Sequence, residues 1–272
     1  MKVLSLFDGI ACGRVALERA HIPVETYYAS EIDKYAIQIA LKNYPDIIQI
    51  GDVTQIDFSK YTGKIDLLIG GSPCQGFSFA GKQLNFADPR SRLFFDFVRA
   101  LKIIKPKYFL LENVKMKQEF QDIISSQLGG VQPIEINSAL VSAQNRKRLY
   151  WTNIPNVRAP EDKKIMLQDI IENGSVDRAK SYCIDANYYK GGSLKNYLEK
   201  KRRQGVFKQS ELRLMVQQSE SNFRKLTPIE CERLQTLPDN YTADISDTQR
   251  YKCLGNGWTV DVIAHIFNGL KE

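Results

Sequence analysis

The chain begins with the stretch that decides its fold, residues 3–13, which read VLSLFDGIACG. Residues 3–7 are mostly apolar, as expected of a buried strand, and a helical pattern follows from Cys12 to Ala20. The loop between them contains Gly9, and glycine in such a loop lets the backbone approach a ligand closely. A plain structural turn would carry the same residues, so this unit by itself only favours a nucleoside-binding site.

The same alternation continues to about Trp151. Further strands are predicted at 26–30, 47–50, 65–69 and 108–111, and helices at 33–43, 93–104 and 120–128. This order indicates an α/β fold, a Rossmann-like parallel sheet with helices on both faces. Ligands of such sheets bind at the carboxyl ends of the strands, so the informative residues should directly follow the strands.

Composition excludes several classes of protein. With 272 residues, 43% of them hydrophobic and 25% charged, the chain is not a disordered tail, a collagen-like rod or a small stapled scaffold. Its five cysteines form no Cys-x-x-Cys pair, which favours a reducing compartment and no metal site. We expect neither a signal peptide nor a membrane span, since no apolar run approaches the ~18 residues a span needs.

The net charge of +7 has one source. The stretch from Lys180 to Lys225 holds 11 basic and 4 acidic residues (11 − 4 = +7), whereas the rest of the chain holds 27 of each. This stretch lies where the strand–helix alternation is lost, and a helix start returns at Thr227-Pro228. We therefore predict a catalytic domain from residues 1–151 and 225–272 and a small basic insert at 152–224. A solvated surface of uneven charge is the alternative.

Acidic residues follow the first strands. Glu31 comes after the second strand and suits ribose hydroxyls, and Asp52 comes after the third and suits an adenine amino group. Asp8 lies in the first loop itself. Its charge would repel a pyrophosphate but suits a cationic cofactor.

Cys74 follows the most apolar strand, in the turn Gly70-Gly71-Ser72-Pro73-Cys74-Gln75-Gly76. A single cysteine is usually a small buried apolar residue. Here the strand end, the turn and the long polar loop to Arg92 favour a nucleophile, because a thiolate reacts readily even as a minor species at neutral pH.

Two further parts of the sequence contain residues suited to catalysis or binding. Glu112 lies in the run LLENV at 110–114, at the end of a predicted strand. A carboxyl with apolar neighbours can serve as an acid there, although it could equally cap the next helix. Residues 144–148 read QNRKR, and on an extended strand Gln144, Arg146 and Arg148 would share one face. Two guanidinium groups there could bind a phosphate and a base carbonyl. Alternatively, the strand is basic only because it faces solvent.

Taken in order, these motifs resemble the DNA cytosine-5 methyltransferase family. The resemblance continues through RKLT at 224–227, RLQTLPD at 233–239 and GNGW at 255–258, and only residues 152–222 lack a match. Details such as LFDGIA at 6–11, SRLFF at 91–95 and GW at 257–258 are most similar to the animal de novo branch. We expect none of that branch's regulatory domains and a stand-alone enzyme of bacterial or phage type. The implied fold is the S-adenosylmethionine-dependent methyltransferase sheet, with a target-recognition insert.

The resemblance implies how four catalytic residues act. Cys74 would attack C6 of cytosine, Glu112 would assist at N3 and the amino group, Arg148 would contact O2, and Arg146 would hold a phosphate or the active-site carboxylate. C5 would then take a methyl group from S-adenosylmethionine, and loss of the C5 proton would expel Cys74. Since C5 and C6 are hidden in a duplex, the base must be flipped out.

The resemblance also implies two sets of binding residues. The cofactor would be bound by Phe7, Asp8, Gly9, Ile10, Ala11, Gly13, Glu31, Ile32, Asp52, Val53, Ser72, Pro73, Asn256, Trp258 and Val260. DNA would be bound by Gln75, Ser78, Arg92, Gln144, Lys200, Lys201, Arg202 and Arg203, with the tyrosines around them packing in the groove.

The expected partner is double-stranded DNA, bound by a monomer, with no membrane and no metal. A cognate restriction endonuclease is a further candidate partner, and the expected location is the cytoplasm, at the nucleoid. Two alternatives keep the fold. A transfer-RNA branch is disfavoured because its Cys-Phe-Thr sequence is missing, and an inactive DNA-binding protein is disfavoured by the intact Cys74, Glu112 and Arg148.

Overall fold

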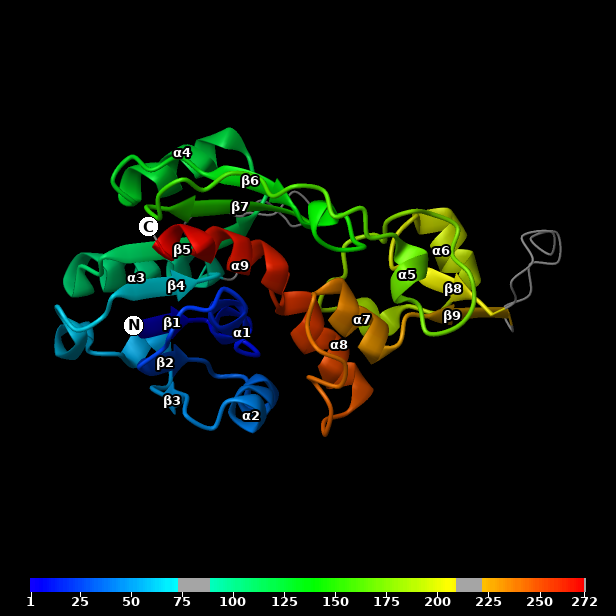
Figure 1. The fold of residues 1–272 in the computed structure, drawn as a ribbon, viewed down its shortest axis with the longest axis horizontal. Coiled ribbons are helices and arrows are strands. Elements are labelled where there is room, and N and C mark those ends of the chain that lie inside the picture. The colour runs from blue at the N-terminus through cyan, green and yellow to red at the C-terminus, as the bar shows by residue number, and fades with distance from the viewer. Residues whose placement is uncertain (73–88, 209–221, 272) are drawn as a thin grey trace. The chain divides into compact units, whose positions relative to one another are not determined.

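The computed structural model describes residues 1–72, 89–208 and 222–271 (Figure 1). They divide into two compact units. The first, which we call the sheet unit, comprises Met1–Ile136, Lys147–Ala159 and Val262–Glu272. The second, the hairpin unit, comprises Asn137–Arg146 and Pro160–Asp261. These bounds differ from those of the two predicted domains, because residues 225–261 group with the hairpin unit.

The sheet is mostly parallel. Among the described residues its strands are β1 (Lys2–Leu6), β2 (Thr26–Ser30), β3 (Ile48–Gln49), β4 (Leu67–Gly70), β5 (Tyr108–Val114), β6 (Ile134–Asn137) and β7 (Lys147–Thr152), in the order β3-β2-β1-β4-β5-β7-β6. The first five pair in parallel, but β7 runs antiparallel to β5. The prediction of a parallel sheet was wrong for β7. Its connection from β6 is too short for a crossover helix, so the chain must reverse.

Helices follow most strands of the sheet unit. They are α1 (Cys12–Arg19), α2 (Lys34–Asn43), α3 (Pro89–Ile104) and α4 (Gln118–Gln127), and α9 (Val260–Phe267) begins in the hairpin unit and ends in the sheet unit. A core of buried side chains joins one face of the sheet to α3 and α4. It includes Leu68, Leu111 and Trp151 from strands, Phe97 from α3 and Ile124 from α4. The apolar spacing of the sequence is what places these residues on one side.

The hairpin unit contains α5 (Leu167–Ile170), α6 (Leu194–Lys200), β8 (Gly205–Phe207), β9 (Phe223–Lys225), α7 (Pro228–Leu234) and α8 (Asp247–Asn256) (Figure 1). Strands β8 and β9 form an antiparallel hairpin. A small cluster of Leu194, Tyr197 and Phe223 packs behind it, with Tyr182 and Phe207 at its edge. The predicted start of α7 is confirmed, since Thr227 and Glu230 form a capping box around Pro228.

One local prediction was wrong. Residues 144–148 do not form a single extended strand, because β7 begins only at Lys147. Gln144 instead makes an isolated bridge with Ser181. Gln144 and Arg146 therefore belong to the hairpin unit and Arg148 to the sheet unit.

Candidate active site and nucleic-acid interface

The loop after β1 has an unusual backbone. Phe7, Gly9 and Ala11 all have positive φ, at 57°, 61° and 60°. Two of these are not glycine, and side chains in this conformation are strained unless the surroundings hold them. Phe7 is partly exposed, whereas Ile10, Ala11 and Gly13 are buried. The loop is therefore a fixed structure that presents the Phe7 ring and the backbone near Gly9.

Glu31 fixes this loop from the end of β2. Its Oε2 accepts a hydrogen bond from the Gly9 backbone N–H at 2.8 Å. Its Oε1 accepts from the N–H groups of Ile32 and Asp33 at 2.7 and 2.8 Å. A carboxylate held in this way keeps lone pairs for further donors such as ribose hydroxyls. Beside it, Ile32 is 75% exposed, a position open to a ligand.

Asp8 is the unsatisfied group of the loop. It is buried, its Oδ1 accepts from the Tyr27 hydroxyl at 2.7 Å, and its Oδ2 has no hydrogen-bond partner among the described residues. Burial raises the pKa of this carboxyl to about 7, hydrogen bonds from Ser5 and Tyr27 oppose the shift, and the nearby Glu31 charge adds to it. A buried carboxyl with one unused oxygen is suited to a cationic ligand.

Asp52 and Val53 form the next strand-end turn. The exposed Asp52 caps a 3-10 turn, η1 (Val53–Gln55), by accepting from the Thr54 N–H at 2.9 Å. Arg99 of α3 holds the same turn, donating to the carbonyls of Val53 and Ile56 at 2.9 and 3.0 Å. Sequence reasoning missed Arg99, because a charged residue in an apolar helical pattern is ordinarily read as a surface position.

Asn113 fixes the end of β4. Its Nδ2 lies 3.4 Å from the Ser72 carbonyl and 3.3 Å from its Oγ, and both residues are buried. This contact holds the chain where it enters the predicted nucleophile segment. Pro73, Cys74, Gln75 and Ser78 lie outside the described residues, as does the side chain of Arg92 at the start of α3.

Glu112 and Arg148 meet on neighbouring strands. Glu112 of β5 lies opposite Tyr150 in the antiparallel register, two residues from Arg148 on β7, so both side chains project from the same face. Arg148 Nε lies 2.9 Å from Glu112 Oε1, and only 15% and 11% of the two side chains are exposed. A contact with the active-site carboxylate was predicted for Arg146, but the structure gives this contact to Arg148. The β5–β7 pairing that brings Arg148 to Glu112 was not revealed by the sequence.

Gln144 and Arg146 point into the hairpin unit. The buried Gln144 amide donates to the Leu234 carbonyl at 2.7 Å and to Gln235 Oε1 at 2.9 Å. Arg146 is 3% exposed and donates to the carbonyls of Ile184 and Gly257 at 3.0 and 2.9 Å. Both side chains thus tie the segment before β7 to the rest of this unit.

The GNGW segment lies in the same network. Gln235 donates to the carbonyls of Leu254 and Gly257 at 2.7 and 3.0 Å, and the Val260 N–H donates to the Gln235 carbonyl at 3.0 Å. Asn256 is exposed, Trp258 is partly exposed and Val260 is fully buried. The predicted cofactor residues therefore fall into two groups, from Phe7 to Ser72 in the sheet unit and from Asn256 to Val260 in the hairpin unit.

The basic side chains of the stretch from Lys180 to Lys225 are of two kinds, some exposed to solvent and others hydrogen-bonded inside the hairpin unit. Lys200, Lys201 and Arg202 are exposed, whereas Arg203 is half-buried. Lys180 instead donates to three backbone carbonyls, those of Ala139, Ser142 and Ile165, at 2.7, 3.0 and 2.6 Å. Among the predicted groove-packing tyrosines, Tyr188 and Tyr197 are buried in the core of the unit, and Tyr182 and Tyr189 are partly exposed.

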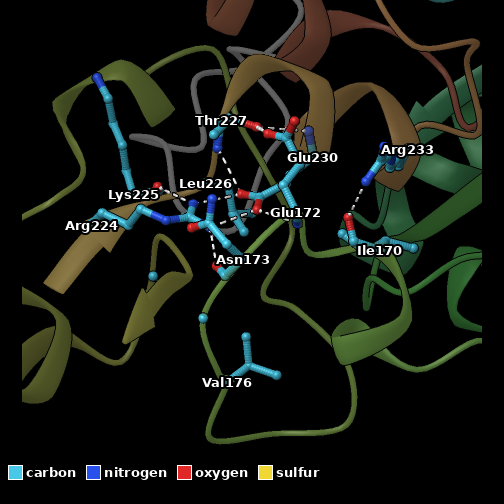
Figure 2. A network of polar contacts seen from close by, with 12 residues as sticks. Ile170, Glu172, Asn173, Val176, Arg224, Lys225, Leu226, Thr227, Glu230 and Arg233 are labelled. Carbon is cyan, nitrogen blue, oxygen red and sulfur yellow. Dashed lines mark hydrogen bonds and ion pairs between the residues drawn. The ribbon is translucent and has the colours of Figure 1, made fainter. Parts of the chain in front are cut away.

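Arg224, at the end of the basic stretch, is also internal (Figure 2). It makes a two-pronged ion pair with Glu230, both at 2.8 Å, and Glu230 is fully buried. Glu230 also accepts from the N–H groups of Thr227 and Glu172 at 2.8 and 3.0 Å. This network joins β9 to α7 and to the loop at 172–173, and it leaves Arg224 no donor pair to offer DNA.

Comparison with known proteins identifies the family. The model of the C-5 cytosine-specific DNA methylases matches residues 1–173 and 131–272, and the chain belongs to this family. The type II methyltransferase M1.ScrFI of Lactococcus lactis subsp. cremoris is 33% identical over all of this chain and 78% of its own length. The type II methyltransferase M.NlaX of Neisseria lactamica is 31% identical over 99% of this chain and 96% of its own.

Solved structures share the fold. The methyltransferase EhMeth of Entamoeba histolytica superposes with a TM-score of 0.77 at 21% identity, over 100% of this chain and 99% of its own. A DNMT2 from Spodoptera frugiperda gives 0.75 at 21% identity, with the same coverage. Family and fold imply S-adenosylmethionine as the methyl donor. Over the part of the chain that the structure describes, no helix is long and apolar enough to cross a membrane.

Proposed function

We propose that the protein transfers a methyl group from S-adenosylmethionine to C5 of cytosine in double-stranded DNA. Membership of the C-5 cytosine-specific DNA methylase family gives the reaction. The observation that carries the assignment to this chain is the buried Glu112–Arg148 pair, 2.9 Å apart, at the end of the strand next to β4. The carboxyl ends of neighbouring parallel strands share one edge of the sheet, which supports the proposal that Cys74 acts beside this pair.

The chemistry follows from these groups. The Cys74 thiolate adds to C6 of the flipped cytosine and forms the C6–sulfur bond. The π electrons of the C5–C6 double bond move to C5 and are delocalised over C4 and N3, which makes C5 nucleophilic. Glu112 interacts with N3 and the amino group and stabilises the added charge. C5 would then take the methyl group from S-adenosylmethionine, whose sulfur–methyl bond breaks to release S-adenosylhomocysteine. A base then removes the C5 proton and the C6–sulfur bond breaks, which restores the aromatic ring.

Arg148 has two tasks in this proposal. Its Nε orients Glu112, its Nη1 donates to the Lys147 carbonyl at 2.9 Å, and we assign the contact with O2 of the base to Nη2. We assign Arg146 and Gln144 a positioning task instead of a direct DNA contact, because both are buried and bonded inside the hairpin unit. Arg146 acts through the Gly257 carbonyl on the segment that contains Asn256.

The proposed cofactor site uses the loop after β1. The Phe7 ring stacks on adenine, Glu31 accepts the ribose hydroxyls, and Asp52 and Val53 bind the adenine edge, with Ile32 beside it. Asp8 is the counter-charge of the cationic cofactor, which its unpartnered Oδ2 supports. Gly9, Ile10, Ala11, Gly13, Ser72 and Pro73 shape the backbone, and Asn256, Trp258 and Val260 border the methionine end.

The hairpin unit is proposed to bind the target DNA. The exposed Lys200, Lys201 and Arg202 contact phosphates, and Arg203, Gln75, Ser78 and Arg92 line the remaining interface. We retain residues 152–224 as the recognition region and propose a monomer on DNA in the cytoplasm, at the nucleoid. The relatives named type II methyltransferases support a cognate restriction endonuclease as a partner.

Sequencing of modified bases tests the activity. DNA from cells that express the protein is read by bisulfite or nanopore sequencing, and we expect 5-methylcytosine in one short sequence context. Expression of the Cys74→Ala variant is the matched control and should give none. Absence of modified cytosine with the unaltered protein, at good expression, would contradict the proposal.

A covalent trap tests the mechanism. With 5-fluorocytosine DNA and S-adenosylmethionine, the C5 substituent cannot leave, so we expect an adduct that survives denaturing electrophoresis. Cys74→Ala should lose the adduct while it still binds the cofactor. An adduct that persists in this variant would place the nucleophile elsewhere.

A further inference from the structure

Arg178 lies in a loop of the hairpin unit, just outside the basic stretch. Its guanidinium is stacked on an aromatic ring, with Cζ 3.9 Å from the centre of the Tyr182 ring. A second ring, that of Tyr197, lies 5.9 Å away. Stacking of this kind fixes the plane of an arginine, which is otherwise a flexible side chain.

The inner edge of Arg178 is anchored. Its Nε donates to Asp177 Oδ1 at 3.2 Å and to the Tyr197 hydroxyl at 3.3 Å. Tyr197 is buried and bonds both oxygens of Asp177, at 2.6 and 2.7 Å. The fully buried Gln204 also lies against Asp177 and Tyr197, at 3.4 and 3.2 Å. The support beneath the guanidinium is therefore part of the core of this unit.

The outer edge of Arg178 is unused. Within the described ranges, neither Nη1 nor Nη2 has a hydrogen-bond partner, and 30% of the side chain is exposed. Arg224 shows what the same group does when it serves the fold, since both its terminal nitrogens are taken by Glu230 (Figure 2). Arg178 instead offers two parallel donors in a fixed plane.

A planar pair of donors matches two kinds of acceptor on DNA, O6 and N7 of guanine in the major groove or two oxygens of a phosphate. A phosphate needs charge but little orientation, and the exposed Lys200, Lys201 and Arg202 already provide such charge. An arginine whose plane is set in advance suits a base edge, where discrimination depends on geometry. We propose that Arg178 reads the O6/N7 edge of a guanine in the target sequence.

This inference rests on the proposed function, because it requires DNA as the substrate. It predicts that the sequence context found by sequencing contains a guanine. Arg178→Lys keeps the charge but loses the planar fork, so kcat/KM on the target should fall 10- to 100-fold. Methylation should spread to sites that differ at that guanine, while the dissociation constant of S-adenosylmethionine stays unchanged.

The decisive experiment replaces each guanine of the target in turn with 7-deazaguanine, which lacks the N7 acceptor. For the unaltered protein, 7-deazaguanine at one position of the target should lower kcat/KM about tenfold. For Arg178→Lys, the same replacement at that position should cause no further loss. Arg158→Lys, the same change at an exposed arginine of the sheet unit, should keep the full sensitivity. A second set of duplexes with single methylphosphonates removes phosphate charges one at a time.

Tyr182→Leu is the second variant, because it removes the stacking surface and leaves Arg178 in place. We expect a partial loss of discrimination at the same guanine, with an unchanged thermal midpoint confirming folding. Additive losses from Arg178→Lys and 7-deazaguanine would overturn the proposal. The proposal would also be overturned if the loss from Arg178→Lys were non-additive with the loss from a methylphosphonate and not with that from 7-deazaguanine. A target sequence without guanine would overturn it as well. Failure of the proposed function is distinguishable from these outcomes, because the unaltered protein would then methylate no DNA in the sequencing experiment.

Discussion

Outside the Glu112–Arg148 pair, the two compact units treat buried carboxylates differently. In the sheet unit, Asp8 is buried with one oxygen bonded to Tyr27 and the other without a partner among the described residues. In the hairpin unit, Glu230 and Glu232 are fully buried, and both oxygens of each accept hydrogen bonds. Glu232, for example, accepts from two backbone N–H groups and pairs with Arg250 at 3.0 Å.

This difference separates groups that hold the fold from groups that await a ligand. A satisfied buried carboxylate recovers its cost of desolvation inside the protein. An unsatisfied one raises the free energy of the empty protein and is expected where a ligand later completes the bonding. We therefore propose that Glu230 and Glu232 serve stability and that Asp8 serves cofactor binding.

The largest expected effect concerns Glu230. Glu230→Ala leaves the half-buried Arg224 guanidinium without its carboxylate partner, and the free energy of unfolding should fall by about 3–5 kcal/mol. Urea denaturation followed by circular dichroism measures this loss. Glu161→Ala, at an exposed position, is the control and should change stability by less than about 0.5 kcal/mol. Equal stability of the two variants would break the comparison.

Asp8→Asn should have the opposite effect, because it should weaken cofactor binding and leave the stability of the fold intact. The neutral amide has the same shape and lacks the burial cost of the charge, so stability should be unchanged or higher. Affinity for S-adenosylmethionine should fall about tenfold, the order of one hydrogen bond to a charged group. Calorimetric titration measures the dissociation constant, with the exposed Asp122→Asn as the control. An unchanged constant would remove Asp8 from the cofactor site.

The pH dependence of stability sharpens the same comparison. The pKa of Asp8 is raised to about 7 in the folded protein, whereas an unfolded aspartate titrates near pH ~3.9. Between these values the folded state holds a proton that the unfolded state has lost. The contribution of Asp8 to stability is thus complete below about pH 4 and is lost as the pH rises through about 7. Urea midpoints from pH 5 to 8 should fall less steeply for Asp8→Asn, and parallel profiles would contradict the assignment.

The smallest effect on stability is expected on the surface of the hairpin unit. Changing Lys200, Lys201 and Arg202 together to Gln should shift the free energy of unfolding by less than about 0.5 kcal/mol, because all three are exposed. The slope of log affinity for DNA against log salt should become shallower by about 3, one counterion for each lost charge. Fluorescence anisotropy at several salt concentrations gives the slope, and an unchanged slope would exclude these residues from the interface.

Much of the sequence pattern predicted structure correctly because it reflects local forces. The start of α7 depends on Thr227, Pro228 and Glu230, which lie within four consecutive positions and cap each other. The strand–loop–helix at residues 2–19 depends on neighbouring apolar side chains and a glycine. The motifs also sufficed for the family, because their order and spacing are properties of the chain itself.

The fate of individual charges was decided by the tertiary structure. Arg146 and Arg148 are alike in sequence, yet one bonds the Gly257 carbonyl 111 positions away and the other pairs with Glu112. The basic stretch looked uniform, but Lys180 and Arg224 are used inside the fold and Lys200 to Arg202 are not. Arg99, Arg178 and the unpartnered oxygen of Asp8 gave no signal in the sequence. Sequence alone thus determined the fold class, the family and its reaction, because local patterns and motif order encode them. Only tertiary structure decided which charges are satisfied, because their partners come from distant parts of the chain.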